Sequence, residues 1–93
     1  MEITLTNWKH LFQNWPQDTP RRGILVTKLN EQIPFSGFLV SEAFLLVQRQ
    51  TPDSLGARTV VLPYDELAAM KLVDVVKASV FQKLGFEGKL PAQ

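Results

Sequence analysis

Apolar residues recur along the middle of the chain in five short runs, at residues 24–29, 33–40, 44–50, 58–62 and 68–72. Turn-forming residues separate them, and runs of this length and composition are typical of β-strands. In the second run, Ile33, Phe35 and Leu39 share one face, and Gly37 stands where the opposite face also becomes apolar. A glycine inside a strand commonly marks a sharp bend. The pattern predicts a strongly bent five-stranded antiparallel small barrel over residues 23–72.

A helix is predicted before this sheet, over residues 1–16. Trp8, Leu11, Phe12 and Trp15 follow the spacing of one helical face, with Thr6 as a candidate N-cap. Pro16 would end the helix, because the residue before a proline is disfavoured in helical geometry. The aromatic face has two interpretations, a lid over an open end of the barrel or an exposed surface for a partner or a base.

A second helix is predicted after the sheet, over residues 74–85. Asp74 can cap its start, and Gly85 stands where a left-handed C-terminal residue is favoured, with Phe86 able to pack back on Phe81. Residues 87–93 are expected to form a loose tail. The prediction is therefore one mainly β domain over residues 1–93, with a helix on each side of the sheet. Asn30 is the residue best suited to a positive φ in the turn after the first strand.

Composition narrows the function. The chain has 93 residues, a net charge of +1 and no cysteine. This charge gives no long-range attraction for a polyanion, and the missing thiols exclude disulfides and thiolate metal sites. The start of the chain lacks the features of a secretory signal, and no apolar run reaches the roughly 20 residues that span a bilayer. The expectation is a cytoplasmic protein that does not enter membranes.

The order of the predicted elements resembles the Sm-like (LSm) family over about half of the chain. Gly37-Phe38-Leu39 is similar to the Gly-x-Leu of that family's bent strand, and residues 64–72 are similar to its closing turn and strand. The resemblance implies an open five-stranded barrel, related to SH3-like barrels, whose edge strands pair between subunits into rings that often bind RNA. The family's uridine-binding residues are missing, because residues 41–46 contain no Asn and residues 62–64 contain no Arg-Gly.

Residues suited to catalysis are few. His10 is the only histidine and falls on the polar face of the first predicted helix, where a surface role is favoured over that of a base or ligand. Asp65 and Glu66 would hold a hard cation only with further oxygen ligands, so solvated turn residues are the preferred interpretation. We predict no enzyme activity, no cofactor, no metal and no small-molecule substrate.

Three basic residues are candidate contacts for an anion or RNA, namely Lys28, Arg49 and Arg58. Charges beside a hairpin loop are also ordinary solubility devices. Arg49 and Arg58 would lie close together if their strands pair, and two guanidinium groups repel unless an anion or a carboxylate, such as that of Asp53, lies between them. In a ring, repeated pairs would form a basic collar.

The strands carry more apolar side chains than one small barrel can enclose. Four of them are candidates for a subunit interface: Phe38, Val40, Phe44 and Leu46. Large exposed apolar patches are rare on soluble monomers, so contacts between copies are the expected location for this excess. The prediction is a non-catalytic homo-oligomeric interaction or scaffold module, expected to form a ring. The alternative is an RNA-binding ring that lacks the usual uridine pocket.

Overall fold

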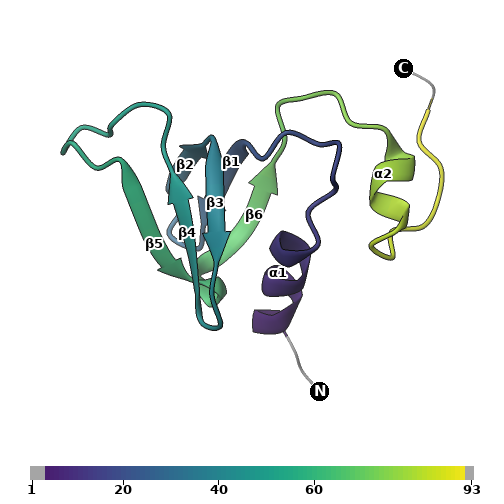
Figure 1. Cartoon of the computed structure of the whole chain (residues 1–93), viewed down its shortest axis with the longest axis horizontal. Coiled ribbons are helices and arrows are strands. Elements are labelled where there is room, and N and C mark those ends of the chain that lie inside the picture. Colours follow the sequence, from purple (N-terminus) through teal and green to yellow (C-terminus); the bar gives the residue numbers. More distant parts are fainter. Residues whose placement is uncertain (1–3, 92–93) are drawn as a thin grey trace.

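The computed structural model describes the backbone of residues 4–91 and the side chains of residues 7–91. Two short helices flank six strands (Figure 1). In chain order the elements are α1 (Thr4–Gln13), β1 (Gly23–Thr27), β2 (Gln32–Phe35), β3 (Gly37–Val40), β4 (Phe44–Gln48), β5 (Thr59–Pro63), the 3-10 turn η1 (Tyr64–Glu66), β6 (Leu67–Lys71) and α2 (Ala78–Gln82). No helix in this range is long and apolar enough to cross a membrane.

The predicted five-stranded barrel is wrong. The strands form two separate three-stranded antiparallel sheets, ordered β2-β1-β6 and β3-β4-β5, and neither closes on itself. The predicted second strand is divided at Ser36, whose backbone N–H donates to the carbonyl oxygen of Gln48 at 2.8 Å. Residues before this point pair with β1, and residues after it pair with β4. At the other side, β5 and β6 follow one another through η1 without pairing, which leaves the structure open.

The division at Ser36 also changes which side chains face inward. Phe35 and Phe38 are both buried, at 3% and 5% exposure, whereas Leu39 is 65% exposed. The expectation that Leu39 shares the inner face with Ile33 and Phe35 is therefore wrong. Because side chains alternate along a strand, one residue outside the ladder moves every following side chain to the other face.

The core lies between the two sheets and α1, and its alternating pattern follows the strands. In β1 and β4 every second residue is buried, including Leu25, Leu45 and Val47 at 0% exposure. The remaining members of the buried apolar cluster are Phe12, Ile33, Phe35, Phe38, Leu62, Tyr64 and Leu67.

Helix α1 contributes the aromatic part of the core. Phe12 is 1% exposed and makes an edge contact with Phe38, with ring centroids 5.0 Å apart. Trp8 and Trp15 pack against the same cluster, and the indole N–H of Trp15 donates to the carbonyl of Thr19 at 3.0 Å. The aromatic face therefore packs against the two sheets, although there is no barrel for it to close. The helix already includes Thr4, the first residue that the structure describes, so Thr6 lies inside it rather than at its N-cap.

Helix α2 is shorter than predicted because Asp74 has another partner. Its carboxylate accepts two bonds from the Arg22 guanidinium, at 2.7 and 3.0 Å, and the helix begins only after Lys77. The ion pair lowers the pKa of Asp74 and raises that of Arg22. Two predictions near the turns are confirmed: Gly85 has φ 99°, and Phe86 packs on Phe81 with centroids 5.8 Å apart.

The turn after β1 follows the prediction as well. Asn30 has φ 67° and is the only residue other than glycine with a positive φ in the part of the chain that the structure describes. Its N–H donates to the carbonyl of Thr27, and the Thr27 hydroxyl accepts from the N–H of Glu31. The turn therefore satisfies its own backbone groups locally.

Two glycines with different surroundings give a matched stability test. A Cβ at Gly23 would lie 2.6 Å from the carbonyl oxygen of Lys71 on the paired strand β6. Gly23→Ala is therefore expected to lower the free energy of unfolding by about 1–3 kcal/mol, as overpacking does. At Gly37 the nearest atom would be Gln48 Oε1 at 3.8 Å, and φ is not positive. Gly37→Ala is expected to leave stability unchanged or to raise it by up to about 1 kcal/mol.

Urea denaturation followed by circular dichroism measures both variants against the parent chain. Equal losses in the two variants would show that the bend at Ser36 and Gly37 needs glycine for a reason other than space.

Candidate functional site

The outer face of the β3-β4-β5 sheet carries a row of apolar side chains. In the pairing register, Leu39 of β3 lies opposite Leu46 of β4, which lies opposite Val61 of β5. Leu39 and Val61 are 65% and 57% exposed, and Leu46 is half-buried. A second row beside it contains Phe44, at 49% exposure, opposite Pro63. These five residues are called the outer apolar face below.

The core leaves this face uncovered because it occupies the other side of the sheet. Phe38, Leu45, Val47 and Leu62 alternate with the residues of the outer apolar face and are buried. A sheet with one covered side normally carries polar residues on the other. This sheet instead carries apolar residues on both sides, and exposed apolar patches are unusual on monomeric proteins.

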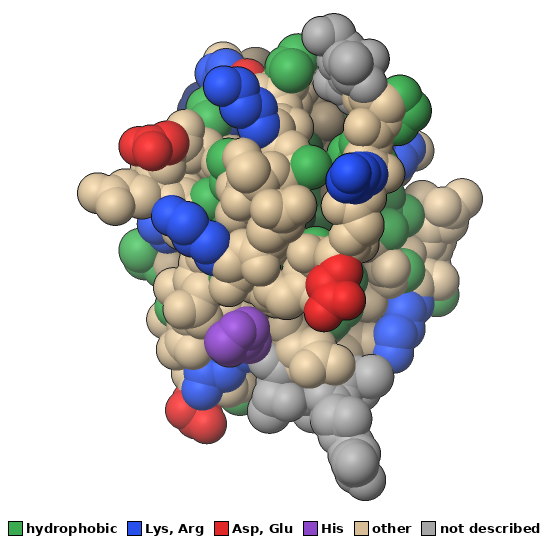
Figure 2. All heavy atoms as spheres, turned by 90° about the vertical axis from the view of Figure 1, so that its right-hand side faces the viewer, with side chains coloured by type: hydrophobic (Ala, Val, Ile, Leu, Met, Phe, Trp, Pro, Cys, Tyr) green, Lys and Arg blue, Asp and Glu red, His purple; other side chains and the backbone are tan. Residues whose placement is uncertain are grey.

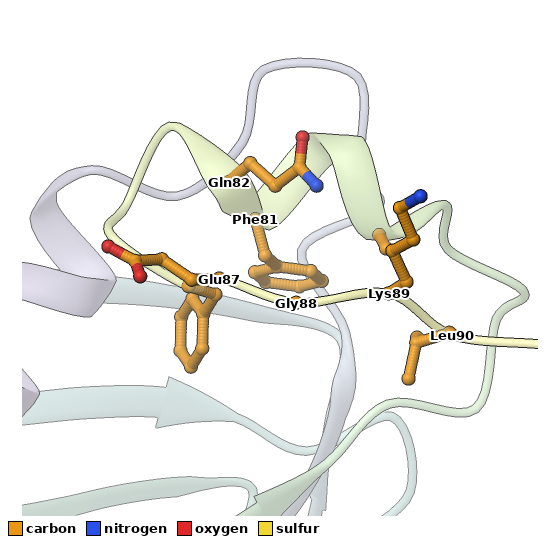
Figure 3. A pocket seen from close by; sticks show the side chains of 8 residues that line it. Phe81, Gln82, Glu87, Gly88, Lys89 and Leu90 are labelled. Atoms are coloured by element: carbon orange, nitrogen blue, oxygen red, sulfur yellow. The ribbon is translucent and has the colours of Figure 1, made fainter.

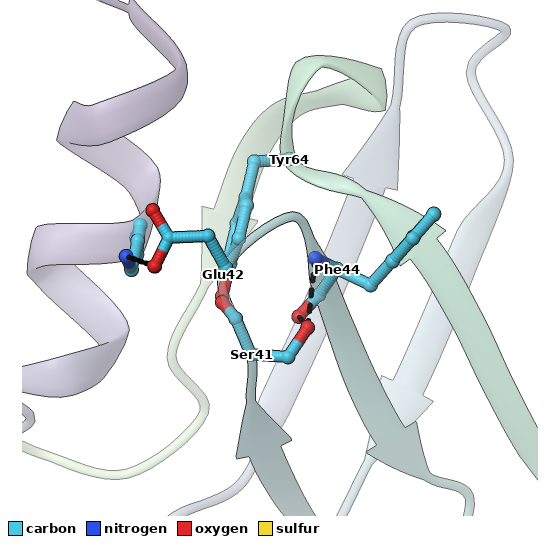
Figure 4. A network of polar contacts seen from close by, with 5 residues as sticks. Ser41, Glu42, Phe44 and Tyr64 are labelled. Carbon is cyan, nitrogen blue, oxygen red and sulfur yellow. Dashed lines mark hydrogen bonds and ion pairs between the residues drawn. The ribbon is translucent and has the colours of Figure 1, made fainter.

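The hairpin between β3 and β4 holds one end of this face in place (Figure 4). The Ser41 hydroxyl accepts from the N–H of Phe44 at 3.1 Å and donates to the Phe44 carbonyl at 3.0 Å. The Tyr64 hydroxyl donates to the Ser41 carbonyl at 2.8 Å, which ties the hairpin to η1. Burial raises the pKa of Tyr64.

A shallow pocket of about 320 Å³ adjoins this hairpin. Its rim carries an ion pair in which Lys9 Nζ donates to Glu42 Oε1 at 2.8 Å and lowers the pKa of Glu42. The Glu42 side chain is 93% exposed, so this pair is screened by solvent. The lining is Lys9, Glu42, Ala43, Phe44, Pro63, Tyr64 and Asp65.

The four residues predicted for the subunit interface separate into two sets. Phe44 and Leu46 lie on the outer apolar face. Phe38 lies in the core, and Val40 packs against the core. Leu39 and Val61 were missed. The sequence did contain a signal for Leu39, because the apolar positions change from one face to the other near Gly37. We interpreted this change as a second apolar face. It instead reflects the break at Ser36, after which the side chains alternate in the opposite phase.

The three predicted basic contacts do not form one cluster. Arg49 and Arg58 lie directly opposite each other, and the Arg49 N–H donates to the Arg58 carbonyl at 2.7 Å. The Arg49 side chain donates to the carbonyl of Thr51. Lys28 lies past the other end of β5, where its backbone N–H bonds to Glu66.

Asp53 lies in the loop between Arg49 and Arg58 but is occupied by the loop itself. Its carboxylate accepts from the backbone N–H groups of Leu55 and Ala57 at 2.9 and 2.8 Å. These bonds lower its pKa most, and the Arg49 charge adds to the effect. The carboxylate therefore shapes the loop more than it bridges the two arginines.

Charged residues elsewhere are dispersed. On the face that carries α2, Lys and Arg side chains lie scattered among Asp and Glu (Figure 2). Within residues 7–91 no group of three His, Asp or Glu side chains is placed to hold a metal ion. His10 is exposed, with Nδ1 3.3 Å from the Asn14 side-chain nitrogen. A hollow of about 280 Å³ beside α2 is lined mainly by Phe81, Phe86 and Leu90, where the tail returns along the helix (Figure 3).

Comparison with protein-family models, with curated proteins and with solved structures finds no match to this chain. The outer apolar face is therefore the principal basis for a functional proposal.

The bond from Tyr64 to the hairpin gives a pH-dependent prediction. The pKa of Tyr64 is raised in the folded state, so its share of stability is complete below the unfolded pKa of about 10 and is lost as the pH rises above that value. Tyr64→Phe is expected to lower stability at pH 7 by about 0.5–1.5 kcal/mol, because it removes the bond to Ser41.

The measurement is the urea midpoint of both proteins between pH 7 and pH 11. The parent chain is expected to lose stability more steeply above pH 10 than Tyr64→Phe, which lacks the ionising hydroxyl. Parallel curves would contradict the assignment, since other alkaline titrations are common to both proteins.

Proposed function

We propose that this protein is a non-catalytic interaction module that self-associates through the outer apolar face of its β3-β4-β5 sheet. The observation that carries the proposal is the row of Leu39, Leu46 and Val61, which crosses the whole sheet and ends at the edge strand β5. Apolar rows on neighbouring strands form one contiguous patch, and burial of such a patch is favourable by about 25 cal/mol per Å².

Self-association agrees with the chemistry of the remaining surface. The protein has a net charge of +1, so copies of the chain do not repel each other strongly. The assembly predicted from the Sm-like resemblance, a ring, would use sheet edges, and β5 and β6 each have one unpaired edge within their sheets. The proposed role is that of a scaffold whose activity is to bind copies of itself.

RNA binding is the second candidate, and one observation supports it. Arg49 and Arg58 lie directly across the ladder from each other, as the notion of a basic collar requires. The basic residues are otherwise scattered, so this candidate ranks below self-association. Filter binding to single-stranded RNA at several salt concentrations separates the two: affinity that falls steeply with salt and is lost in Arg49→Ala/Arg58→Ala would favour the RNA-binding candidate.

Static light scattering across micromolar concentrations tests self-association. The parent chain is expected to exceed the monomer mass of 10.5 kDa. Phe44→Glu is expected to return it to the monomer mass, because a charge on the outer apolar face would have to be desolvated on assembly.

Leu55→Glu is the matched control, since Leu55 is 92% exposed and lies in the loop between β4 and β5, away from the face. It is expected to assemble as the parent does. Circular dichroism checks that both variants fold. A parent chain of 10.5 kDa at every concentration would overturn the proposal.

A further inference from the structure

Within the part of the chain that the structure describes, the backbone groups along the outer edge of strand β5 have no partner. The bond from the Arg49 N–H to the Arg58 carbonyl fixes the direction of the ladder between β4 and β5. Backbone groups alternate in an antiparallel ladder, so Val60 and Leu62 direct theirs toward β4. Thr59 and Val61 therefore direct their N–H and C=O groups outward, and Pro63 directs its C=O outward. A proline without an N–H is typical of such an edge.

The opposite edge of the same sheet is partly covered. The bond from the Ser41 N–H to the Phe44 carbonyl shows that these two residues form a hydrogen-bonded pair of the ladder. Hydrogen-bonded pairs alternate along an antiparallel ladder, so Leu39 and Leu46 form the next one. Phe38 therefore directs its backbone groups away from β4. The Arg21 guanidinium donates to that Phe38 carbonyl at 3.2 Å and lies 3.9 Å above the Phe38 ring. A charged side chain that lies over an edge strand opposes pairing with another chain. Strand β5 is therefore the less protected edge of this sheet.

The charges at the two ends of β5 have opposite signs. Arg58 comes directly before the strand, and Asp65 and Glu66 lie in η1 directly after it; all three are exposed. When two copies of β5 lie antiparallel, the positive end of each meets the negative end of the other. Val61 is the central residue of Thr59–Pro63, so a two-fold axis that pairs the two strands over their full length would pass beside it.

We propose that two copies of this chain pair along β5, antiparallel and related by a two-fold axis at Val61. This inference rests on the proposed self-association and specifies one contact of the assembly. Pairing along β5 leaves Leu39, Leu46 and Phe44 on one open face of the joined sheet, so covering that face takes a second contact between paired copies. Val61 exchanges both backbone hydrogen bonds with the partner's Val61, and the Thr59 N–H donates to the carbonyl of the partner's Pro63. The two three-stranded sheets become one continuous sheet, and the apolar rows of both copies join across the axis.

Pairing of β5 with β6 of another copy is less favourable on the same criteria. In an antiparallel arrangement it places Arg58 at the same end as the partner's Lys71, and the acidic residues of η1 from both copies at the other end. Strand β6 also adds only Ala68 and Ala69 as exposed apolar side chains at its centre. The two-fold pairing instead brings opposite charges together and continues the row with Val61, Leu46 and Leu39.

Cysteine cross-linking tests the position of the axis, since the chain contains no cysteine of its own. Residues in a hydrogen-bonded antiparallel pair have Cα atoms about 5.5 Å apart, within the range of a disulfide. Val61→Cys is expected to yield most of the protein as a linked dimer after mild oxidation with oxidised glutathione. Leu39→Cys is the matched control: it is equally exposed on the same face but far from the axis, and is expected to remain unlinked.

Charge reversal tests the pairing of the strand ends. Arg58→Glu and Asp65→Lys/Glu66→Lys are each expected to weaken dimerisation roughly tenfold, because each places like charges at both ends of the interface. An equimolar mixture of the two variants is expected to recover the parent affinity, since both ends of the mixed dimer then carry opposite charges. Sedimentation velocity measures all three samples.

The outcomes separate the two proposals. A parent chain that stays monomeric overturns self-association and the pairing with it. If the parent chain assembles, either of two results would overturn the pairing but not the self-association. One is that Leu39→Cys links more readily than Val61→Cys. The other is that Arg58→Glu strengthens assembly, because in β5 to β6 pairing it would relieve repulsion with the partner's Lys71. Cross-linking only in Val61→Cys/Ala69→Cys would likewise replace the two-fold dimer with β5 to β6 pairing.

Discussion

The division of one extended segment at Ser36 is the constraint on which the rest of the structure depends. Up to Phe35 the segment pairs with β1, and from Gly37 it pairs with β4. The division therefore directs one stretch of chain into two sheets. It also changes the alternation of side chains, so that Phe35 and Phe38 both enter the core while Leu39 faces outward. Without this change the outer apolar face would lose one end of its row.

The aromatic residues of α1 depend on the same division. Phe12 contacts both Phe35 and Phe38, which lie on strands of different sheets. A single ring thus connects the helix with the two sheets across their junction. Trp15, near the start of the linker after α1, and Arg21, near its end, also contact Phe38. Aromatic contacts of this kind contribute about 0.5–1.5 kcal/mol each beyond burial alone.

Local chemistry in the sequence predicted the turns and the strand positions well. Asn30 and Gly85 adopt the positive φ values that these residue types favour, and Phe44, Leu45, Leu46 and Val47 alternate as expected. The prediction of one strongly bent five-stranded barrel is wrong, because whether the strands join into a barrel depends on long-range pairing, such as that between β5 and β6, which no local pattern encodes. Gly37 marked the region of the bend, but its conformation and its open surroundings show no need for glycine there.

The candidate face was predicted in part for the same reason. Phe44 and Leu46 follow directly from alternation, whereas Leu39 required knowledge of the parity change, and Val61 required the register between β4 and β5. Asp74 is a second case in which a local signal predicted the wrong contact. This residue is well suited to cap a helix, but it binds Arg22, 52 positions earlier in the chain. Long-range partners of this kind compete with local preferences.

The attachment of the C-terminal segment has a consequence for how the molecule opens. No residue of helix α2 is completely buried. Two hollows, of about 320 and 520 Å³, lie between the residues in and after α2 and those of α1 and the linker that follows it. The Arg22 and Asp74 pair holds the chain just before this helix. Regions with few buried contacts exchange amide hydrogens and admit proteases well before the whole domain unfolds. The two sheets can therefore stay folded while the segment after Lys71 undergoes local unfolding and refolding.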